Sequence, residues 1–341
     1  MRGTSIGVVK MKKSEIDNLR KVMGTLPHRD PEIVYDYANA LKSCTVKLID
    51  IPKNPYKNIV AMAVATWGSG KMGEDEGSCG KWKKLTPENR FKIVVSALKG
   101  KTLPTCLESI KFLFEFNGIP RHTFDQFARL RIGAGIASIG CRDNSKLDAP
   151  FILYPELDEM LEKDTSFKKM FESWMKETKD LYAKILSTSK GSYQIARTVL
   201  PMCYNHSWVC TINYKALKEQ CLRRMMACEE APIVLIFWKM REEIKKLSPL
   251  LANYLRPLCD ITKKCVYAGG AEDLSKLFSC LFKGCGRYPA EHEYAEFNLS
   301  CSSYDEISKY VEIVTPDEWT EYGINDFDKL SETDKKLFRE E

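Results

Sequence analysis

The sequence predicts an α+β protein in which a sheet packs against long helices. Apolar side chains recur every three or four residues over residues 166–186, 214–228 and 231–247, which is the period of an amphipathic helix. Residues 44–52 and 107–117 are instead rich in β-branched or aromatic residues and end at Pro or Asn-Gly, as strands do. Because strand and helix patterns fall in separate stretches of the chain, we expect this class.

Local signals place the other elements. Residues 1–41 are expected to form two short helices that flank a break at residues 24–31. Asn54 and Pro55 predict a helix start, because Asn is a good N-cap and Pro is tolerated at the first helical position. Residues 68–84 are rich in Gly and Lys and predict an exposed loop.

The composition is that of a folded protein, with 341 residues, 44% hydrophobic residues and a net charge of +6. The longest apolar run, residues 231–238, is far shorter than the roughly 20 residues of a membrane-spanning helix. The N-terminal residues lack the apolar run of a signal peptide. We therefore expect a soluble cytoplasmic protein without a membrane partner.

The distribution of charge and the number of cysteines indicate what kind of partner the chain binds and in what state its thiols are. Residues 302–341 carry a net charge of −7, so residues 1–301 carry +13, which favours an anionic partner such as a nucleic acid or a phosphorylated molecule. The 13 cysteines are odd in number and scattered, which favours reduced thiols or a metal site over a disulfide framework.

The first segment that carries candidate site residues is residues 121–143. It places Gln126, Arg129 and Arg131 at the end of a predicted helix that runs into the small residues 133–140, interpreted as a glycine-rich turn. Arginine offers a planar fork of donors, and glycine lets the backbone approach a ligand. The segment predicts an anion site, although a solvated basic helix end gives the same pattern.

The second segment is residues 193–233. Arg197 precedes an apolar stop at residues 199–201, and Arg223 and Arg224 follow about three turns into the next helix. By itself this pattern also suits a solvated helix face.

Together the two segments resemble the flavin-dependent thymidylate synthases. That family carries R-H-R-x-x-S with a Gln three residues before the first Arg, and then A-R-x-V-L-P, N-A-R and L-R. The matching positions, which keep one register from Arg197 to Arg224, are Gln126, Arg129, Arg131, residues 196–201, Asn213 and Arg224.

The resemblance implies a fold, an activity and a set of roles. It implies an antiparallel sheet packed with long helices over residues 42–258, an N-terminal helical extension at residues 1–41, and a Cys-containing, acidic C-terminal extension at residues 259–341. It also implies a homotetramer with sites at subunit interfaces, FAD as cofactor, methylenetetrahydrofolate as carbon donor and NADPH as a candidate reductant. By the same resemblance Gln126 and Arg197 hold the nucleotide phosphate, Arg224 faces the base, and Arg129, Arg131 and Asn213 line the flavin site.

Departures from the family pattern point to an altered ligand. Leu130 replaces the central His of R-H-R, and Ala134 replaces the Ser. The usual nucleotide-facing Asn, Glu and Ser are replaced by apolar residues, which leaves Ser138 and Arg142 as the polar substitutes. Since a polar pocket discriminates against ligands that fail to pair with it, we expect a divergent C5 one-carbon transferase. Its substrate is dUMP or a relative such as dCMP, and its product is methylated or hydroxymethylated.

Two other classes stay open. A degenerate member would keep the fold and the nucleotide but not the flavin chemistry. A nucleic-acid-binding protein is less favoured, because no aromatic stripe alternates with the basic residues.

The cysteines add two weaker candidates. Cys141 follows the small-residue stretch, where a thiolate would be placed to add to C6 of a pyrimidine, or where a thiol simply fills space. Four C-terminal cysteines suggest a zinc site or free thiols, but their spacing exceeds or just reaches the usual knuckle; they are Cys259, Cys265, Cys280 and Cys285.

Overall fold

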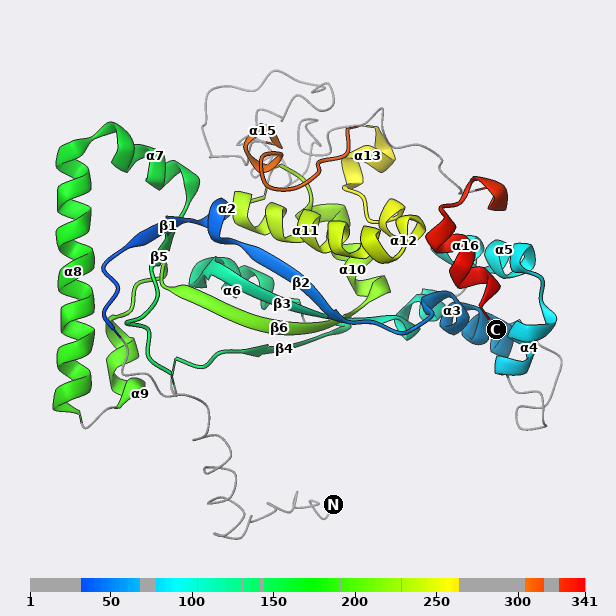
Figure 1. Ribbon diagram of the computed structural model, residues 1–341, viewed down its shortest axis with the longest axis horizontal. Coiled ribbons are helices and arrows are strands. Elements are labelled where there is room, and N and C mark those ends of the chain that lie inside the picture. Colours follow the sequence, from blue (N-terminus) through cyan, green and yellow to red (C-terminus); the bar gives the residue numbers. More distant parts are fainter. Residues whose placement is uncertain are drawn as a thin grey trace, which may run out of the picture.

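A four-stranded antiparallel sheet crosses the middle of the computed structural model, which describes residues 32–67, 78–102, 104–130, 132–141, 144–189, 192–227, 229–263, 304–315 and 325–340 (Figure 1). Its strand order is β2-β3-β6-β4, and each neighbouring pair is antiparallel. The strands are β2 (Thr45–Asp50), β3 (Lys111–Pro120), β6 (Asn205–Asn213) and β4 (Ala134–Ser138). The α+β class predicted from the sequence is confirmed.

Alternating side chains make one face of the sheet the core. On β3, Phe112, Phe114 and Phe116 are buried, whereas the residues between them are only partly covered. The ring of Trp208 on β6 stacks on Phe116, with 4.8 Å between centroids. The buried face packs against α11 (Ala231–Leu247), whose predicted span is confirmed.

Two groups of helices stand at opposite ends of the sheet (Figure 1). One group comprises α3 (Pro55–Trp67), α4 (Ser78–Lys84), α5 (Pro87–Leu98) and the C-terminal α16 (Glu332–Arg339), with η1 (Pro104–Ser109) and η3 (Phe327–Lys329) beside it. At the other end stand α7 (Pro155–Lys163), the long α8 (Thr165–Thr188), α9 (Tyr193–Ala196) and η2 (Arg197–Val199). The remaining elements are β1 (Tyr37–Asn39), α2 (Ala40–Ser43), β5 (Phe151–Leu153), α6 (Arg121–Phe127), α10 (Tyr214–Arg224), α12 (Pro249–Asn253), α13 (Leu258–Thr262) and α15 (Tyr304–Ile307).

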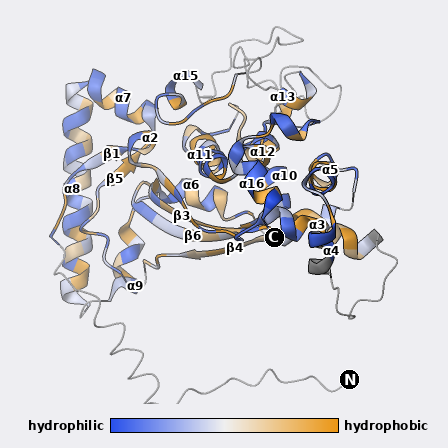
Figure 2. Ribbon diagram, turned by 45° about the vertical axis from the view of Figure 1, so that its right-hand side comes forward, coloured by the Kyte–Doolittle hydropathy of each residue, from blue (hydrophilic) through white to orange (hydrophobic). Residues whose placement is uncertain are grey.

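Helix α8 extends the predicted 166–186 by only a few residues and is amphipathic, as the alternating hydrophilic and hydrophobic turns in Figure 2 show. Its buried face carries Lys179, whose Nζ donates hydrogen bonds to the backbone carbonyls of Val34, Leu147 and Ala149. Three acceptors match the three donors of an ammonium group. This lysine therefore ties α8 to two loop segments. No helix among the described residues is long and apolar enough to cross a membrane.

Three local predictions were wrong. Residues 37–39, predicted to belong to a helix, form β1, which pairs in parallel with β5. The predicted loop at 68–84 ends in α4, where Trp82 is fully buried. Residues 134–138, interpreted as a glycine-rich turn, form the edge strand β4. The predicted break at 24–31 lies outside the described residues.

Strand β3 also differs from its predicted span of 107–117. It begins at Lys111, because the preceding residues form η1, and it runs on to Pro120. A register shift between Phe116 and Ile119 accommodates Gly118, whose φ of +70° favours glycine.

The C-terminal residues contribute to the main core. In α16, Asp334 is fully buried, and its carboxylate accepts hydrogen bonds from Tyr56, Ser248, the Leu250 amide and Ser331. Four uncharged groups thus donate hydrogen bonds to the two oxygens of Asp334, and none of these donors is a cation. Asp334 therefore links the acidic C-terminal residues to α3 and α12.

Changing Asp334 to Asn is expected to lower the free energy of unfolding by about 2 kcal/mol, because an amide nitrogen would face donors in a buried site. Urea unfolding at neutral pH measures this loss. Replacing the exposed Asp328 by Asn supplies the control, since it should change stability by less than about 0.5 kcal/mol. Equal effects of the two changes would contradict the buried network.

Candidate functional site

The predicted site residues on α6 lie at the carboxyl end of that helix. Gln126 is in its last turn and half-buried, and Arg129 lies just beyond the helix and is exposed. The helix ends at Phe127, four residues earlier than the sequence predicted, and Leu130 is buried in the main core. Arg131 lies outside the described residues.

Gln126 contacts the turn between α10 and α11. Its Nε2 donates a hydrogen bond to Oε1 of Glu230, and the hydroxyl of Tyr154 donates to Oε2 of the same carboxylate. Tyr154 follows β5, and its ring lies against His122 with 4.3 Å between centroids. Side chains from two other parts of the chain thus converge on the carboxylate of Glu230.

Arg224 reaches the same turn from the other helix. It is the last residue of α10, its side chain is only 18% exposed, and Nη1 pairs with Oε2 of Glu229. Arg223 pairs with the other oxygen of Glu229 at 3.0 Å, but its side chain is 67% exposed. The structure therefore brings Gln126 and Arg224 to adjacent residues of one turn.

The two glutamates of this turn differ in their surroundings. Burial raises the pKa of Glu230, and the Gln126 amide and the Arg129 charge partly offset that rise. Glu229 instead has two guanidinium groups. The sequence analysis missed Glu229, Glu230 and Tyr154 as site residues; the one available signal was the Glu-Glu pair five residues after Arg224.

Asn213 is the last residue of β6 and caps the start of α10. Its Oδ1 accepts from the Ala216 amide at 2.8 Å, and its backbone N–H donates to the Gly133 carbonyl at 2.8 Å. Gly133 has a φ of +72°, and a Cβ there would lie 2.5 Å from the Asn213 side chain. A side chain at position 133 would therefore be strained and would displace Asn213.

A pocket of about 490 Å³ opens beside Asn213. It is lined by Glu108, Lys111, residues 133–135 and residues 211–213. Lys215, at the second position of α10, pairs with Glu108 at 2.7 Å near this pocket. One wall of the pocket is therefore glycine-containing backbone. Its rim carries a negative charge on Glu108 and positive charges on Lys111 and Lys215.

Arg197 and Ser138 lie elsewhere on the surface. Arg197 begins η2 and is exposed, and its guanidinium makes no ion pair with a described residue. Ser138 ends β4 and is exposed. The structure does not bring either side chain into contact with Gln126 or Arg224, and Arg142 lies outside the described residues.

Cys141 is buried beside a tyrosine. Its thiol donates to the Tyr204 hydroxyl at 2.9 Å, and Arg121 donates to the same hydroxyl at 3.4 Å. Burial and the neighbouring thiol raise the pKa of Tyr204, so this hydroxyl stays protonated. Cys141 is packed in the small core beside α8, as a space-filling thiol would be.

The zinc prediction falls mostly on undescribed residues. Cys259 is buried in α13, whereas Cys265, Cys280 and Cys285 lie outside the described residues. Within the part of the chain that is described, no three His, Cys, Asp or Glu residues are grouped as metal ligands.

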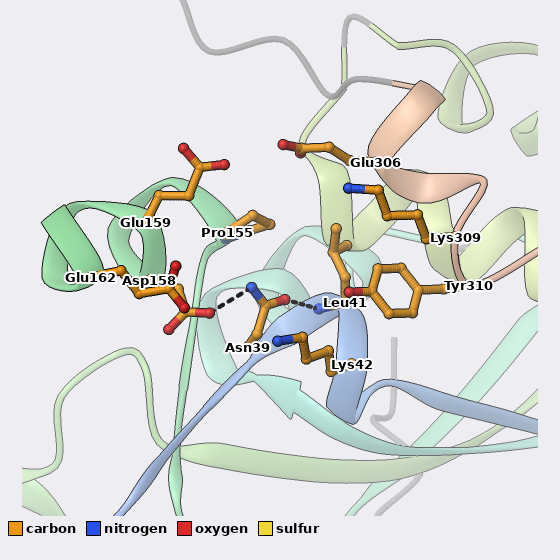
Figure 3. Close-up of a pocket in the computed structure, with 10 residues that line it drawn as sticks. All are labelled: Asn39, Leu41, Lys42, Pro155, Asp158, Glu159, Glu162, Glu306, Lys309 and Tyr310. Carbon is orange, nitrogen blue, oxygen red and sulfur yellow. Dashed lines mark hydrogen bonds between the residues drawn. The ribbon is translucent and has the colours of Figure 1, made fainter.

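A second, acidic pocket of about 230 Å³ lies where α7 meets α15 (Figure 3). Asp158, Glu159 and Glu306 face it, and Asn39 donates to Asp158 at 2.9 Å. Burial and the charges on α7 raise the pKa of Glu306. This pocket joins the C-terminal residues to α7 and holds none of the predicted site residues.

The antiparallel sheet packed with long helices is the fold expected of the flavin-dependent thymidylate synthase class, and Gln126 and Arg224 bind adjacent residues of one turn. Residues 47–250 match the model of the family described as thymidylate synthase complementing protein. Because that match covers more than half of the chain, the chain belongs to this family, as its motifs predicted.

Its curated relatives are distant. It is 27% identical over 235 residues to a flavin-dependent thymidylate synthase of Pyrococcus abyssi, a match that covers 66% of this chain and 87% of the relative. It is 30% identical over 155 residues to the enzyme of that name from Sulfurisphaera tokodaii, covering 46% of this chain and 58% of the relative. This second match spans little more than half of the relative's length.

Among solved structures, the chain resembles a UMP/dUMP methylase, PolB from Streptomyces cacaoi, bound with 5-Br dUMP. The TM-score is 0.50 at 16% sequence identity, and the match covers 64% of this chain and 96% of that protein. This likeness confirms the fold.

Proposed function

We propose that the chain is a flavin-dependent enzyme that transfers a one-carbon unit to C5 of a pyrimidine nucleoside monophosphate. The convergence of Gln126 and Arg224 on the Glu229–Glu230 turn carries this proposal. Both residues match the family's nucleotide motifs, and the fold brings them together although 98 residues separate them in sequence. The name of the family and of the relatives supports a methyltransferase activity.

Charge stabilisation is the task assigned to Arg224. Addition at C6 of a pyrimidine makes C5 nucleophilic and gives the ring an enolate-like negative charge shared with a carbonyl oxygen. A fixed, poorly hydrated guanidinium lowers the cost of that charge. The ion pair with Glu229 holds Arg224 in one position before substrate binds. Positioning and electrostatics are the contributions of this chain in the proposed reaction.

The pocket beside Asn213 fits a flavin. Its volume of about 490 Å³ lies within the range of cofactor sites, and Lys111 supplies a cation for an anionic group. The helix cap uses only Oδ1 of Asn213, so its side-chain NH2 group remains as a donor, and Arg129 and Arg131 complete the set implied by the motif. Bound FAD would supply the hydride, and methylenetetrahydrofolate the carbon.

A homotetramer is part of the same proposal. Large apolar side chains are exposed on one stripe of α8, at Met170, Trp174 and Leu181, and Ile132 in the first motif is 89% exposed. Such surfaces support burial against other subunits. Arg197, exposed on η2, would then act in a neighbouring subunit's site.

Flavin content tests the proposal. We expect the purified full-length protein to be yellow, or to become so with added FAD, and to release flavin absorbance on denaturation. It should also release tritium from C5 of a labelled pyrimidine nucleotide when methylenetetrahydrofolate and NADPH are supplied. Colourless protein that gains no flavin signal with FAD would favour the degenerate, non-catalytic member instead.

A further inference from the structure

The carboxylates of Glu230 and of its neighbour Glu229 have different kinds of hydrogen-bond donors. Glu229 is neutralised by Arg223 and Arg224, whereas the oxygens of Glu230 accept from the uncharged groups of Gln126 and Tyr154. Glu230 lies at the N-cap position of α11, but its side chain does not cap that helix. Its contacts fix the carboxylate in place and leave it without an ion pair among the described residues.

These contacts change what Gln126 offers to a ligand. Its Nε2 gives one of its two hydrogens to Glu230, so one N–H donor and the Oε1 acceptor remain. A carboxylate has about four lone-pair sites, and Gln126 and Tyr154 occupy two at Glu230. The remaining lone pairs of Glu230 repel a phosphate and attract an N–H donor.

The two pyrimidines differ at the edge that such a cluster would meet. Cytosine has an exocyclic amino donor at C4, where uracil has a carbonyl acceptor. At N3 cytosine is an acceptor and uracil a donor. An arginine at the O2 and N3 side together with a carboxylate at the C4 side matches the cytosine pattern, and glutamate is a known acceptor for the cytosine amino group.

We propose that Glu230 is a specificity-determining residue, which accepts a hydrogen bond from the amino group of cytosine and selects a cytidine over a uridine monophosphate. This inference rests on the proposed function, because it takes Gln126 and Arg224 as the walls of the nucleotide site. A uracil carbonyl in the same place would face the lone pairs of Glu230 and would not supply the hydrogen that the cytosine amino group donates. Sites built around buried polar groups reject such mismatched ligands strongly.

Calorimetric titration of the full-length protein with dCMP and with dUMP tests the proposal. The wild type is expected to bind dCMP at least about 10-fold more tightly than dUMP, which corresponds to about 1.4 kcal/mol. Glu230→Gln should bring the two dissociation constants within about threefold, since an amide can also donate to a carbonyl. The exposed Glu162 on α7 provides the matched control, and Glu162→Gln should keep the wild-type ratio.

The outcomes separate this inference from the proposed function. If the wild type binds dUMP as tightly as dCMP, or if Glu230→Gln leaves a dCMP preference unchanged, the inference is wrong while the proposed function stands. If the wild type binds neither nucleotide, the proposed function fails and the inference with it. Should Glu230→Gln not fold, Glu230→Asp keeps the charge on a shorter side chain, and weaker binding of dCMP alone is then the expected result.

Discussion

Replacing Arg224 by Ala is expected to lower kcat/KM at least about 100-fold, or about 2.7 kcal/mol of transition-state stabilisation. The guanidinium is only 18% exposed and is fixed by Glu229, so it acts as a preorganised positive charge. Its removal also leaves Glu229, 11% exposed, with the single partner Arg223. Steady-state kinetics with both dCMP and dUMP measures the loss, and a melting curve shows whether the variant is folded.

Arg223 provides the matched control for that experiment. It is the adjacent residue and pairs with the same carboxylate, but its side chain is 67% exposed. A surface ion pair contributes little, so Arg223→Ala should keep kcat/KM within about threefold of the wild type. A similar loss in both variants would mean that only the ion pair with Glu229 matters, and it would contradict a direct role of Arg224 at the base.

The helices were predictable because their signals are local. For α3, the Asn54 side chain accepts from the amides of Tyr56 and Lys57, as its N-cap position predicts. For α11, the apolar period starts one residue after Glu230 and ends at Leu247 in both the sequence and the structure. Such patterns need no knowledge of distant residues.

Strands at the edges were harder to predict because their pairing is not local. In β4, alternation is hidden by Gly135 and the small residues around it, and its pairing partner β6 lies some 70 residues later. Likewise β1 is defined by its pairing with β5, more than 100 residues away. A short stretch without an amphipathic pattern does not reveal such a partner.

The candidate site shows the same limit. Gln126 and Arg224 were found because the family motifs keep their register, yet the carboxylate between them was not. Glu230 meets Gln126 across 104 residues and Tyr154 across 76, so only the folded chain shows the contact. The feature that distinguishes this chain's proposed substrate therefore lies outside the motifs that place it in its family.

Acid is expected to destabilise the protein through His206, whose imidazole is 1% exposed. Burial, with the charges of Arg121 and Lys146, lowers the pKa of His206 to about 3. The ring stays neutral in the folded protein, but in the unfolded chain it takes up a proton below about pH 6.5. The contribution to stability is therefore complete above pH 6.5 and declines as the pH falls toward 3, by about 3 kcal/mol at pH 4.

His206→Phe isolates this contribution. The ring packs among Phe124, Tyr204 and Trp208, and neither of its nitrogens has a hydrogen-bond partner among the described residues, so phenylalanine keeps the packing and sacrifices no bond. Urea unfolding at pH 7 and pH 4.5 should show a smaller acid-induced loss in the variant than in the wild type. His122→Phe is the comparison. Burial lowers the pKa of His122 as well, but its Nδ1 contacts the Met202 carbonyl at 3.2 Å and Asp125 opposes the shift, so its removal should leave the part of the slope due to His206 intact. Protonation of carboxylates lowers stability in acid in every variant, so the difference between the pH profiles reports the buried imidazole. Parallel profiles for His206→Phe and the wild type would show that folding does not lower the pKa of His206.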